Sequence, residues 1–141
     1  MQYDNDDSSP EVILIAEGRE ILQVSLKNLV LTELPDARVL TVRSGKEAVK
    51  LSLARRPSAV ILHSDLPELN GVEATRQIHS DRPDTPIVLI HAEESAEYRT
   101  SAIEAGAGGY VAKHKIAAEL APVLKKLLPT GSSKDRGKGG D

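Results

Sequence analysis

Three of the four histidines lie where short apolar stretches end: His63 after residues 59–62, His91 after residues 87–90, and His114 close behind residues 110–112. Imidazoles can bind a transition metal such as Zn²⁺, titrate near neutral pH, or serve as neutral groups that bond to backbone or water. In a metal site, Glu17 or Asp65 would be the further ligand. Because the histidines form no local His-x-x-x-His pair, the sequence favours the neutral interpretation. Metal binding and pH sensing stay open as alternatives.

The elements that must position these side chains follow from apolar spacing. Strands are predicted over residues 12–16, 39–42, 59–62, 87–90 and 110–112, and helical spacing occurs over residues 22–30, 44–55, 70–80, 95–106 and 116–127. Strands joined by helices are parallel, and right-handed crossovers place helices on both faces of the sheet. In such sheets function gathers beyond the carboxyl ends of the strands. That edge holds Ala16, Glu17, His63, Asp65, His91, Lys113 and His114.

Local signals mark several helix ends. Ser44 with Glu47, and Asn70 with Glu73, have the spacing of caps in which a side chain accepts from an orphan amide. Gly106 should end the fourth helix, because glycine tolerates the left-handed conformation. These signals agree with the strand and helix pattern and support an α/β fold.

Pro122 conflicts with the last helix, since proline lacks an amide and clashes with the preceding turn. We therefore expect that helix to begin near Ala121 or to bend. Both ends of the chain are polar or glycine-rich and cannot bury enough surface to offset the entropy of ordering. The sequence thus predicts one domain over residues 11–129, flanked by flexible tails at 1–10 and 130–141.

Composition excludes several classes of protein. The chain has 141 residues, 40% of them hydrophobic, which suits one core. A net charge of −3 argues against a nucleic-acid surface, and the absence of Cys excludes disulfides and thiolate chemistry. Aromatic residues are 2%, too few for a stacking platform. No apolar run approaches the roughly 20 residues of a membrane span. We expect a cytoplasmic protein without nucleic-acid or membrane partners.

Two segments resemble a known family. Residues 66–73 read Leu-Pro-Glu-Leu-Asn-Gly-Val-Glu, and residues 105–113 read Ala-Gly-Ala-Gly-Gly-Tyr-Val-Ala-Lys. Together they resemble the receiver domain of bacterial response regulators, which serves in two-component phosphorelay signalling. The resemblance spans nearly all of the predicted domain. It implies a flavodoxin-like, three-layer α/β/α sandwich around a five-stranded parallel sheet of order 2-1-3-4-5.

The family's phosphorylation pocket is degenerate in this sequence. In the family, two acidic residues after the first strand hold Mg²⁺, and by this resemblance their places are Ala16 and Glu17. The phosphate-accepting Asp lies four residues before the loop proline, where this chain has His63. The hydroxyl at the end of the fourth strand is replaced by His91. The lysine is present as Lys113.

The usual proline after that lysine is His114, so the cis bond common in the family would cost about 3 kcal/mol and we predict a trans bond. The resemblance also implies that Glu17 pairs with Lys113. A receiver without its acceptor carboxylate cannot be phosphorylated there, and with few oxygen ligands its Mg²⁺ binding should be weak or lost. We expect a pseudo-receiver that is not an enzyme. Phosphorylation at Asp65 is the alternative.

Family members bind partners through the fourth helix, fifth strand and fifth helix, here residues 95–126. The resemblance implies an interaction face that includes Tyr98, Ile103 and Tyr110, with Tyr110 at the place of the family's aromatic switch. The partner would be a sensor kinase, another regulator or a second copy of the chain. His79 lies near the end of the third helix, where a surface position is expected.

Overall fold

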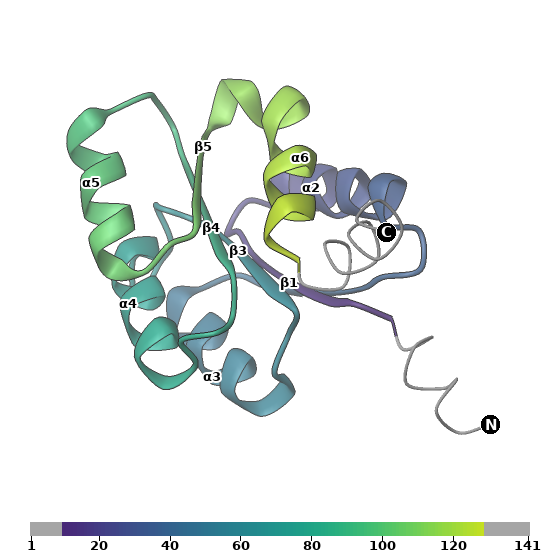
Figure 1. Cartoon of the computed structure of the whole chain (residues 1–141), viewed down its shortest axis with the longest axis horizontal. Coiled ribbons are helices and arrows are strands. Elements are labelled where there is room, and N and C mark those ends of the chain that lie inside the picture. The colour runs from purple at the N-terminus through teal and green to yellow at the C-terminus, as the bar shows by residue number, and fades with distance from the viewer. Residues whose placement is uncertain (1–9, 129–141) are drawn as a thin grey trace, which may run out of the picture.

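The computed structural model describes residues 10–128 and contains one parallel sheet with helices between its strands (Figure 1). The strands are β1 (Val12–Ala16), β2 (Arg38–Val42), β3 (Ala59–His63), β4 (Ile87–His91) and β5 (Gly109–Ala112). The helices are α2 (Glu20–Glu33), α3 (Gly45–Arg55), α4 (Gly71–Asp81), α5 (Ala96–Ala105), the short 3₁₀ helix η1 (Lys113–Lys115) and α6 (Ile116–Leu127). The strand order β2-β1-β3-β4-β5 confirms the predicted fold class.

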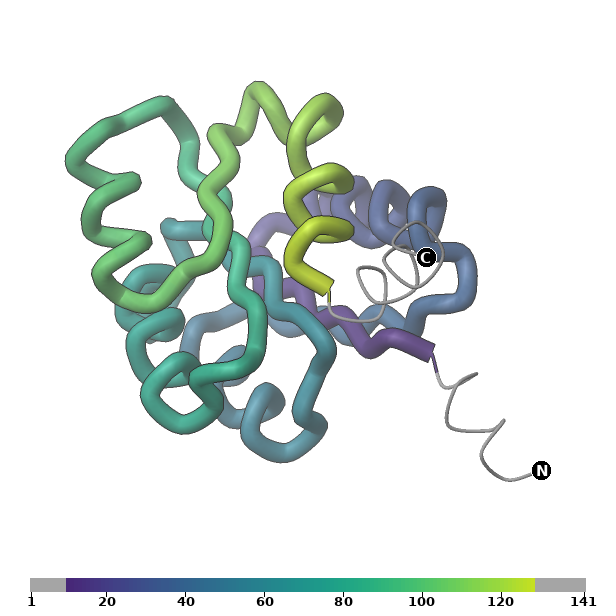
Figure 2. The backbone as a smooth tube through the Cα atoms, in the orientation of Figure 1, coloured from purple at the N-terminus to yellow at the C-terminus, as the bar shows by residue number. Residues whose placement is uncertain are grey.

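The sheet separates two apolar cores, because neighbouring strand residues point to opposite faces. Every second side chain of a strand points to the same face, and on one face Ile61 and Ile90 pack with α2 and α6. Leu62 and Leu89 pack with α3, α4 and α5 on the other. Figure 2 shows the same arrangement, with the central strands running between the two groups of helices. Burial on both faces explains why the strand sequences are continuously apolar.

The predicted helix ends are confirmed. Ser44 and Asn70 accept hydrogen bonds from the backbone amides of Glu47 and Glu73, at 3.1 and 2.9 Å. Gly106 ends α5 with a φ of 113°. A Cβ at that glycine would lie 2.3 Å from Cγ of His79. His79 is therefore half-buried beneath the glycine, so the expected surface position is wrong.

Pro122 lies inside α6, which begins at Ile116. The expected late start near Ala121 is therefore wrong. Leu120 and Leu124, on either side of the proline, are buried against the β1 and β3 side of the core, and this packing stabilises the helix despite the missing amide. The predicted tails lie, except for Pro10, outside the described residues, as does the last residue of the predicted domain.

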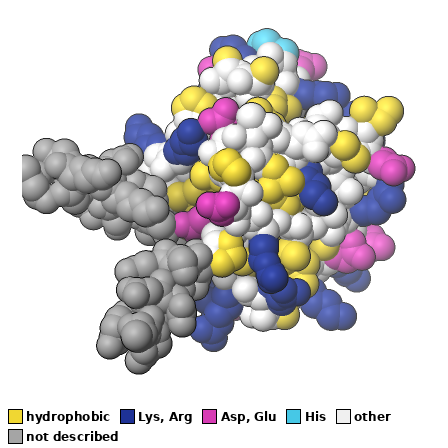
Figure 3. All heavy atoms as spheres, turned by 90° about the vertical axis from the view of Figure 1, so that its right-hand side faces the viewer, with side chains coloured by type: hydrophobic (Ala, Val, Ile, Leu, Met, Phe, Trp, Pro, Cys, Tyr) yellow, Lys and Arg dark blue, Asp and Glu magenta, His cyan; other side chains and the backbone are white. Residues whose placement is uncertain are grey.

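Basic, acidic and apolar side chains are mixed over the face seen in Figure 3, as the small net charge predicts. Within residues 10–128, no helix is both long enough and apolar enough to cross a membrane.

Candidate functional site

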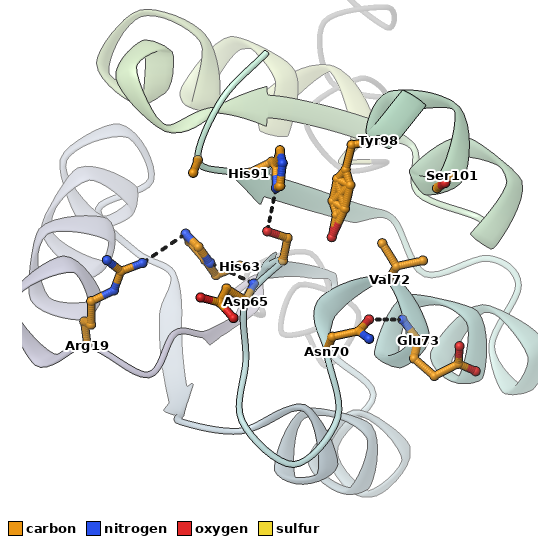
Figure 4. A pocket seen from close by; sticks show the side chains of 11 residues that line it. Arg19, His63, Asp65, Asn70, Val72, Glu73, His91, Tyr98 and Ser101 are labelled. Carbon is orange, nitrogen blue, oxygen red and sulfur yellow. Dashed lines mark hydrogen bonds between the residues drawn. The ribbon is translucent and has the colours of Figure 1, made fainter. Parts of the chain in front are cut away.

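A cleft of about 700 Å³ opens beyond the carboxyl ends of β3 and β4, where the fold is expected to carry its function (Figure 4). Its walls come from the start of α2, the β3–α4 loop, the start of α4, and the β4–α5 segment. The lining residues are Arg19, His63, Ser64, Asp65, Asn70, Val72, Glu73, His91, Ala92, Tyr98 and Ser101.

His63 ends β3 and is 2% exposed. The backbone N–H of Asp65 donates to Nδ1 of His63 at 3.0 Å, so this nitrogen is unprotonated in the structure. Burial lowers the pKa of His63 below its ordinary value. Arg19 and Lys113 act in the same direction, while Glu17 and Asp65 oppose them. His63 is thus a neutral imidazole at the base of the cleft.

Glu17 follows β1 and is also 2% exposed. Its Oε2 accepts from the backbone N–H of Arg19 at 2.8 Å and lies 3.5 Å from Nε of that side chain. Its Oε1 is buried without a hydrogen-bond partner among the described residues. Within residues 10–128, Glu17 makes no ion pair with Lys113, so the expected pairing is wrong. Arg19, two residues away, takes that place.

His91 ends β4, and its Nδ1 is joined to Oγ of Ser64 by a hydrogen bond of 2.8 Å. Its ring centroid lies 3.8 Å from that of Tyr98 on α5. Tyr98 is half-buried, and burial raises its pKa. Figure 4 shows His91 and Tyr98 on the opposite side of the cleft from Arg19 and His63.

The register of β3 and β4 explains why the two histidines do not pair with each other. His63 stands opposite Ile90, so Ser64 stands opposite His91. Alternation then directs His63 toward the face covered by α2 and α6, and His91 toward the face covered by α5. In the described part of the chain, no three His, Asp or Glu side chains are grouped so that they could hold a metal ion.

The remaining predicted site residues lie around this cleft or outside it. Ala16 is the last residue of β1 and is buried, and Glu17 follows it directly. Asp65 is exposed at the cleft wall. Lys113 and His114 are exposed in η1, outside the cleft. The bond between them is trans, as predicted, since the described residues contain no cis bond.

Lys113 lines a neighbouring cavity of about 670 Å³ instead, beside the start of α2. Arg19 borders both cavities. The structure therefore brings Glu17, His63 and Asp65 close to Arg19, and separates His114 from the other two histidines.

The predicted interaction face has one clearly exposed apolar member. Ile103 on α5 is 61% exposed, whereas Tyr110 on β5 is 7% exposed. The Tyr110 hydroxyl donates to the backbone oxygen of Glu93 at 2.9 Å, and the Arg99 guanidinium lies 4.6 Å from its ring centroid. Tyr110 points inward, so its expected surface role is wrong. The exposure of Tyr98 is intermediate between those of Ile103 and Tyr110, and its ring lies beside that of His91.

Sequence reasoning did not single out Arg19 or Ser64. Arg19 could have been found by its place just beyond the first strand, two residues from Glu17. Ser64 follows His63, but its contact with His91 depends on the β3–β4 register, for which the sequence carries no signal.

The strand order and the placing of this cleft define a flavodoxin-like α/β protein. Residues 13–125 match the family described as the response regulator receiver domain, and the chain belongs to that family. It is therefore a receiver domain of two-component signalling.

Relatives include the transcriptional regulatory protein PrrA of Mycobacterium tuberculosis, which is 30% identical over 89% of this chain and 52% of the relative. A protein-glutamate methylesterase/protein-glutamine glutaminase of Desulfitobacterium hafniense is 34% identical over 77% of this chain and 28% of the relative. The chain thus spans about half the length of the first curated relatives it matches, or less.

Solved structures give the same family. The receiver domain of the sensor histidine kinase PA1611 from Pseudomonas aeruginosa, which has magnesium coordinated in its active site cleft, is 27% identical with a TM-score of 0.75. The match covers 84% of this chain and 98% of that one. The signal receiver domain of an HD domain-containing protein from Pseudomonas fluorescens is 25% identical with a TM-score of 0.78, over 89% and 99% of the two chains.

Proposed function

We propose that this chain is a pseudo-receiver, a receiver domain that acts by binding a protein partner and is not itself switched by phosphorylation. The observation that carries the proposal is the buried, neutral His63 at the end of β3. An aspartyl phosphate needs a carboxylate nucleophile, and an imidazole at that position cannot form one.

The residues near His63 support weak or absent Mg²⁺ binding. Mg²⁺ prefers several hard oxygen ligands in a near-octahedral arrangement. Of the two positions that the resemblance assigns to the acidic pair, Glu17 is acidic and Ala16 is not, and the Arg19 side chain already neutralises one oxygen of Glu17. The guanidinium would also repel a cation. One buried carboxylate beside a guanidinium and an imidazole does not fit this ion.

Asp65 is the carboxylate that a phosphorylatable receiver would have to use. Its backbone N–H donates a hydrogen bond to Nδ1 of His63, and its side chain is exposed in the loop that follows β3. Phosphoryl transfer to this side chain would also need a bound Mg²⁺ to neutralise the phosphate, which these surroundings do not favour. This placing favours the pseudo-receiver over the Asp65 alternative.

A protein partner would bind the face made by α5, β5 and α6, on which Ile103 is exposed. This partner would be a sensor kinase, another regulator or a second copy of the chain. The proposal assigns the chain no catalytic activity of its own, and a cytoplasmic location stays a prediction.

Incubation with acetyl phosphate and Mg²⁺, followed by intact-mass measurement, tests the proposal. We expect the wild-type chain to gain no phosphoryl group. The matched positive control is the Ala16→Asp/His63→Asp double variant, which restores a carboxylate at the two positions where the resemblance finds one missing.

A phosphoryl group on the wild-type chain would contradict the proposal. If the Asp65→Asn variant then lost that mass, the Asp65 alternative would be correct. A mass that persisted in Asp65→Asn but vanished in His63→Asn would instead indicate a phosphohistidine.

A further inference from the structure

Among residues 10–128, Arg19 and His63 meet as two hydrogen-bond donors with no acceptor between them. Because Nδ1 of His63 accepts from the Asp65 amide, the proton of the neutral ring resides on Nε2. This Nε2–H group lies 3.4 Å from Nη2 of Arg19. A guanidinium has no acceptor atom, so the contact between these two nitrogens is not a hydrogen bond in this tautomer.

No protonation state of His63 removes the conflict. Moving the proton to Nδ1 would let Nε2 accept from Arg19, but Nδ1–H would then face the Asp65 amide. Adding a second proton would leave both ring nitrogens facing donors and would place a charge in a buried position. A buried donor without an acceptor costs about 1–3 kcal/mol in general, so an acceptor between Arg19 and His63 would be favourable.

Both of these residues line the cleft. His63 is 2% exposed and fixed by the Asp65 amide, whereas the Arg19 side chain is 57% exposed and held through Nε by Glu17. Nη2 of Arg19 is the atom left facing His63 (Figure 4). An oxygen with two free lone pairs, as in a carboxylate or phosphate, can accept from both nitrogens at once.

We propose that this cleft reversibly binds a small molecule with an oxyanion group, a carboxylate or phosphate, held between Nε2–H of His63 and Nη2 of Arg19. The cleft of about 700 Å³ exceeds the size of a lone phosphate, and Val72 and Tyr98 offer apolar surface across from the two donors. The ligand is therefore an organic acid or phosphomonoester with an apolar part. Asp65 and Glu73 on the wall disfavour a ligand with several negative charges.

This binding goes beyond the proposed function and does not depend on the absence of phosphorylation. It is non-covalent, and it uses Arg19 and His63 rather than the exposed Lys113. The two proposals can therefore fail separately. A phosphoryl adduct on Asp65 would contradict the pseudo-receiver, but Arg19 and His63 would still offer two donors to an oxyanion.

The test is histidine NMR of the full chain, with inorganic phosphate and acetate as probes and sodium chloride at matched ionic strength as reference. First, the ¹⁵N shifts of His63, assigned with His63→Gln, should show a neutral ring protonated on Nε2. Then phosphate or acetate should shift the His63 ring signals saturably, while the exposed His114 stays unshifted. Phosphate and acetate compared at equal concentration identify which oxyanion the donors prefer.

The Arg19→Gln variant should weaken this binding about ten-fold, the loss typical of one charge-assisted hydrogen bond. Arg43→Gln is the matched control, because Arg43 bonds to the Gly18 oxygen and lines only the neighbouring cavity, and it should keep wild-type binding. Protonation of His63 on Nδ1, the absence of a saturable shift, or equal weakening in Arg43→Gln would overturn the proposal.

Discussion

At the scale of single residues, the proposed function depends on one residue, the imidazole of His63, at the position where the resemblance implies the family's carboxylate. A carboxylate there would be charged at neutral pH and would attract a cation. The imidazole is held neutral by burial and by the Asp65 amide that donates to Nδ1. In the proposed function, this imidazole takes the place of the nucleophile and of one cation ligand, and it directs a neutral donor toward Arg19.

The neutral state of His63 gives a pH dependence of stability with a definite sign. Burial lowers its pKa in the folded protein below the ordinary 6.5, so the unfolded chain binds the proton more readily. The stability that depends on neutral His63 is complete above about pH 6.5. It is lost as the pH falls through the lower, folded-state pKa. Urea unfolding between about pH 7.5 and pH 5 measures this loss.

In His63→Asn, the amide oxygen can still accept from Asp65 but does not titrate, so the free energy of unfolding should fall less between these pH values. His114→Asn is the control, because His114 is exposed and should leave the wild-type dependence unchanged. Equal pH dependence in wild type and His63→Asn would show that His63 is not held neutral.

At the scale of elements, α4 fixes the end of β3 by close approach of their backbones. A Cβ added at Gly71, the first residue of α4, would lie 2.4 Å from the backbone oxygen of His63 and 2.7 Å from Cα of Ser64. Both neighbours are backbone atoms, so one element would have to move. A glycine at this position thus lets the helix start pack against the two residues that form the base of the cleft.

Gly71→Ala should therefore lower the free energy of unfolding by about 1–3 kcal/mol, the usual cost of overpacking. The better helix propensity of alanine offsets part of the cost, by about 1 kcal/mol at most. Gly18→Ala is the control, because its Cβ would make only ordinary contacts, and its effect should stay within about 0.5 kcal/mol. Urea unfolding that gave equal stabilities for the two variants would contradict the close approach.

Local sequence signals were enough to predict the strands, the helix caps at Ser44 and Asn70, and the end of α5 at Gly106. Each depends on residues within one turn or one short run. The contacts of His63 and His91 were not predictable in this way, because they depend on the register between β3 and β4. A shift of one residue would have directed both histidines to the same face.

The pairing of Glu17 shows a second limit of the sequence. The resemblance implied Lys113 as its partner, but Arg19 lies two residues from Glu17 and reaches it through both its backbone amide and its side chain. Pro122 shows a third limit: its missing amide disfavours a helix locally, yet burial of Leu120 and Leu124 keeps α6 helical. In both cases packing or proximity decided between options that the sequence left open.

At the scale of the whole molecule, two separate regions have different functions in the proposal. The cleft opens at the carboxyl edge, and the candidate partner surface lies over α5, β5 and α6. Tyr110 is buried, so Ile103 is the apolar side chain on which binding through this face would depend. Ile21 on α2 is even more exposed, at 85%, but lies outside this face.

If the partner is a second copy of the chain, sedimentation velocity over a range of concentrations should detect a dimer, and Ile103→Asp should weaken it at least about ten-fold. That loss corresponds to the roughly 1.5–3 kcal/mol gained when an isoleucine leaves water. Ile21→Asp makes the same chemical change at a more exposed position and should leave the dimer intact. Equal weakening by both variants would show that the dimer interface includes α2. A wild-type chain that stays monomeric would show that this face does not bind a second copy, which leaves other proteins as its partners.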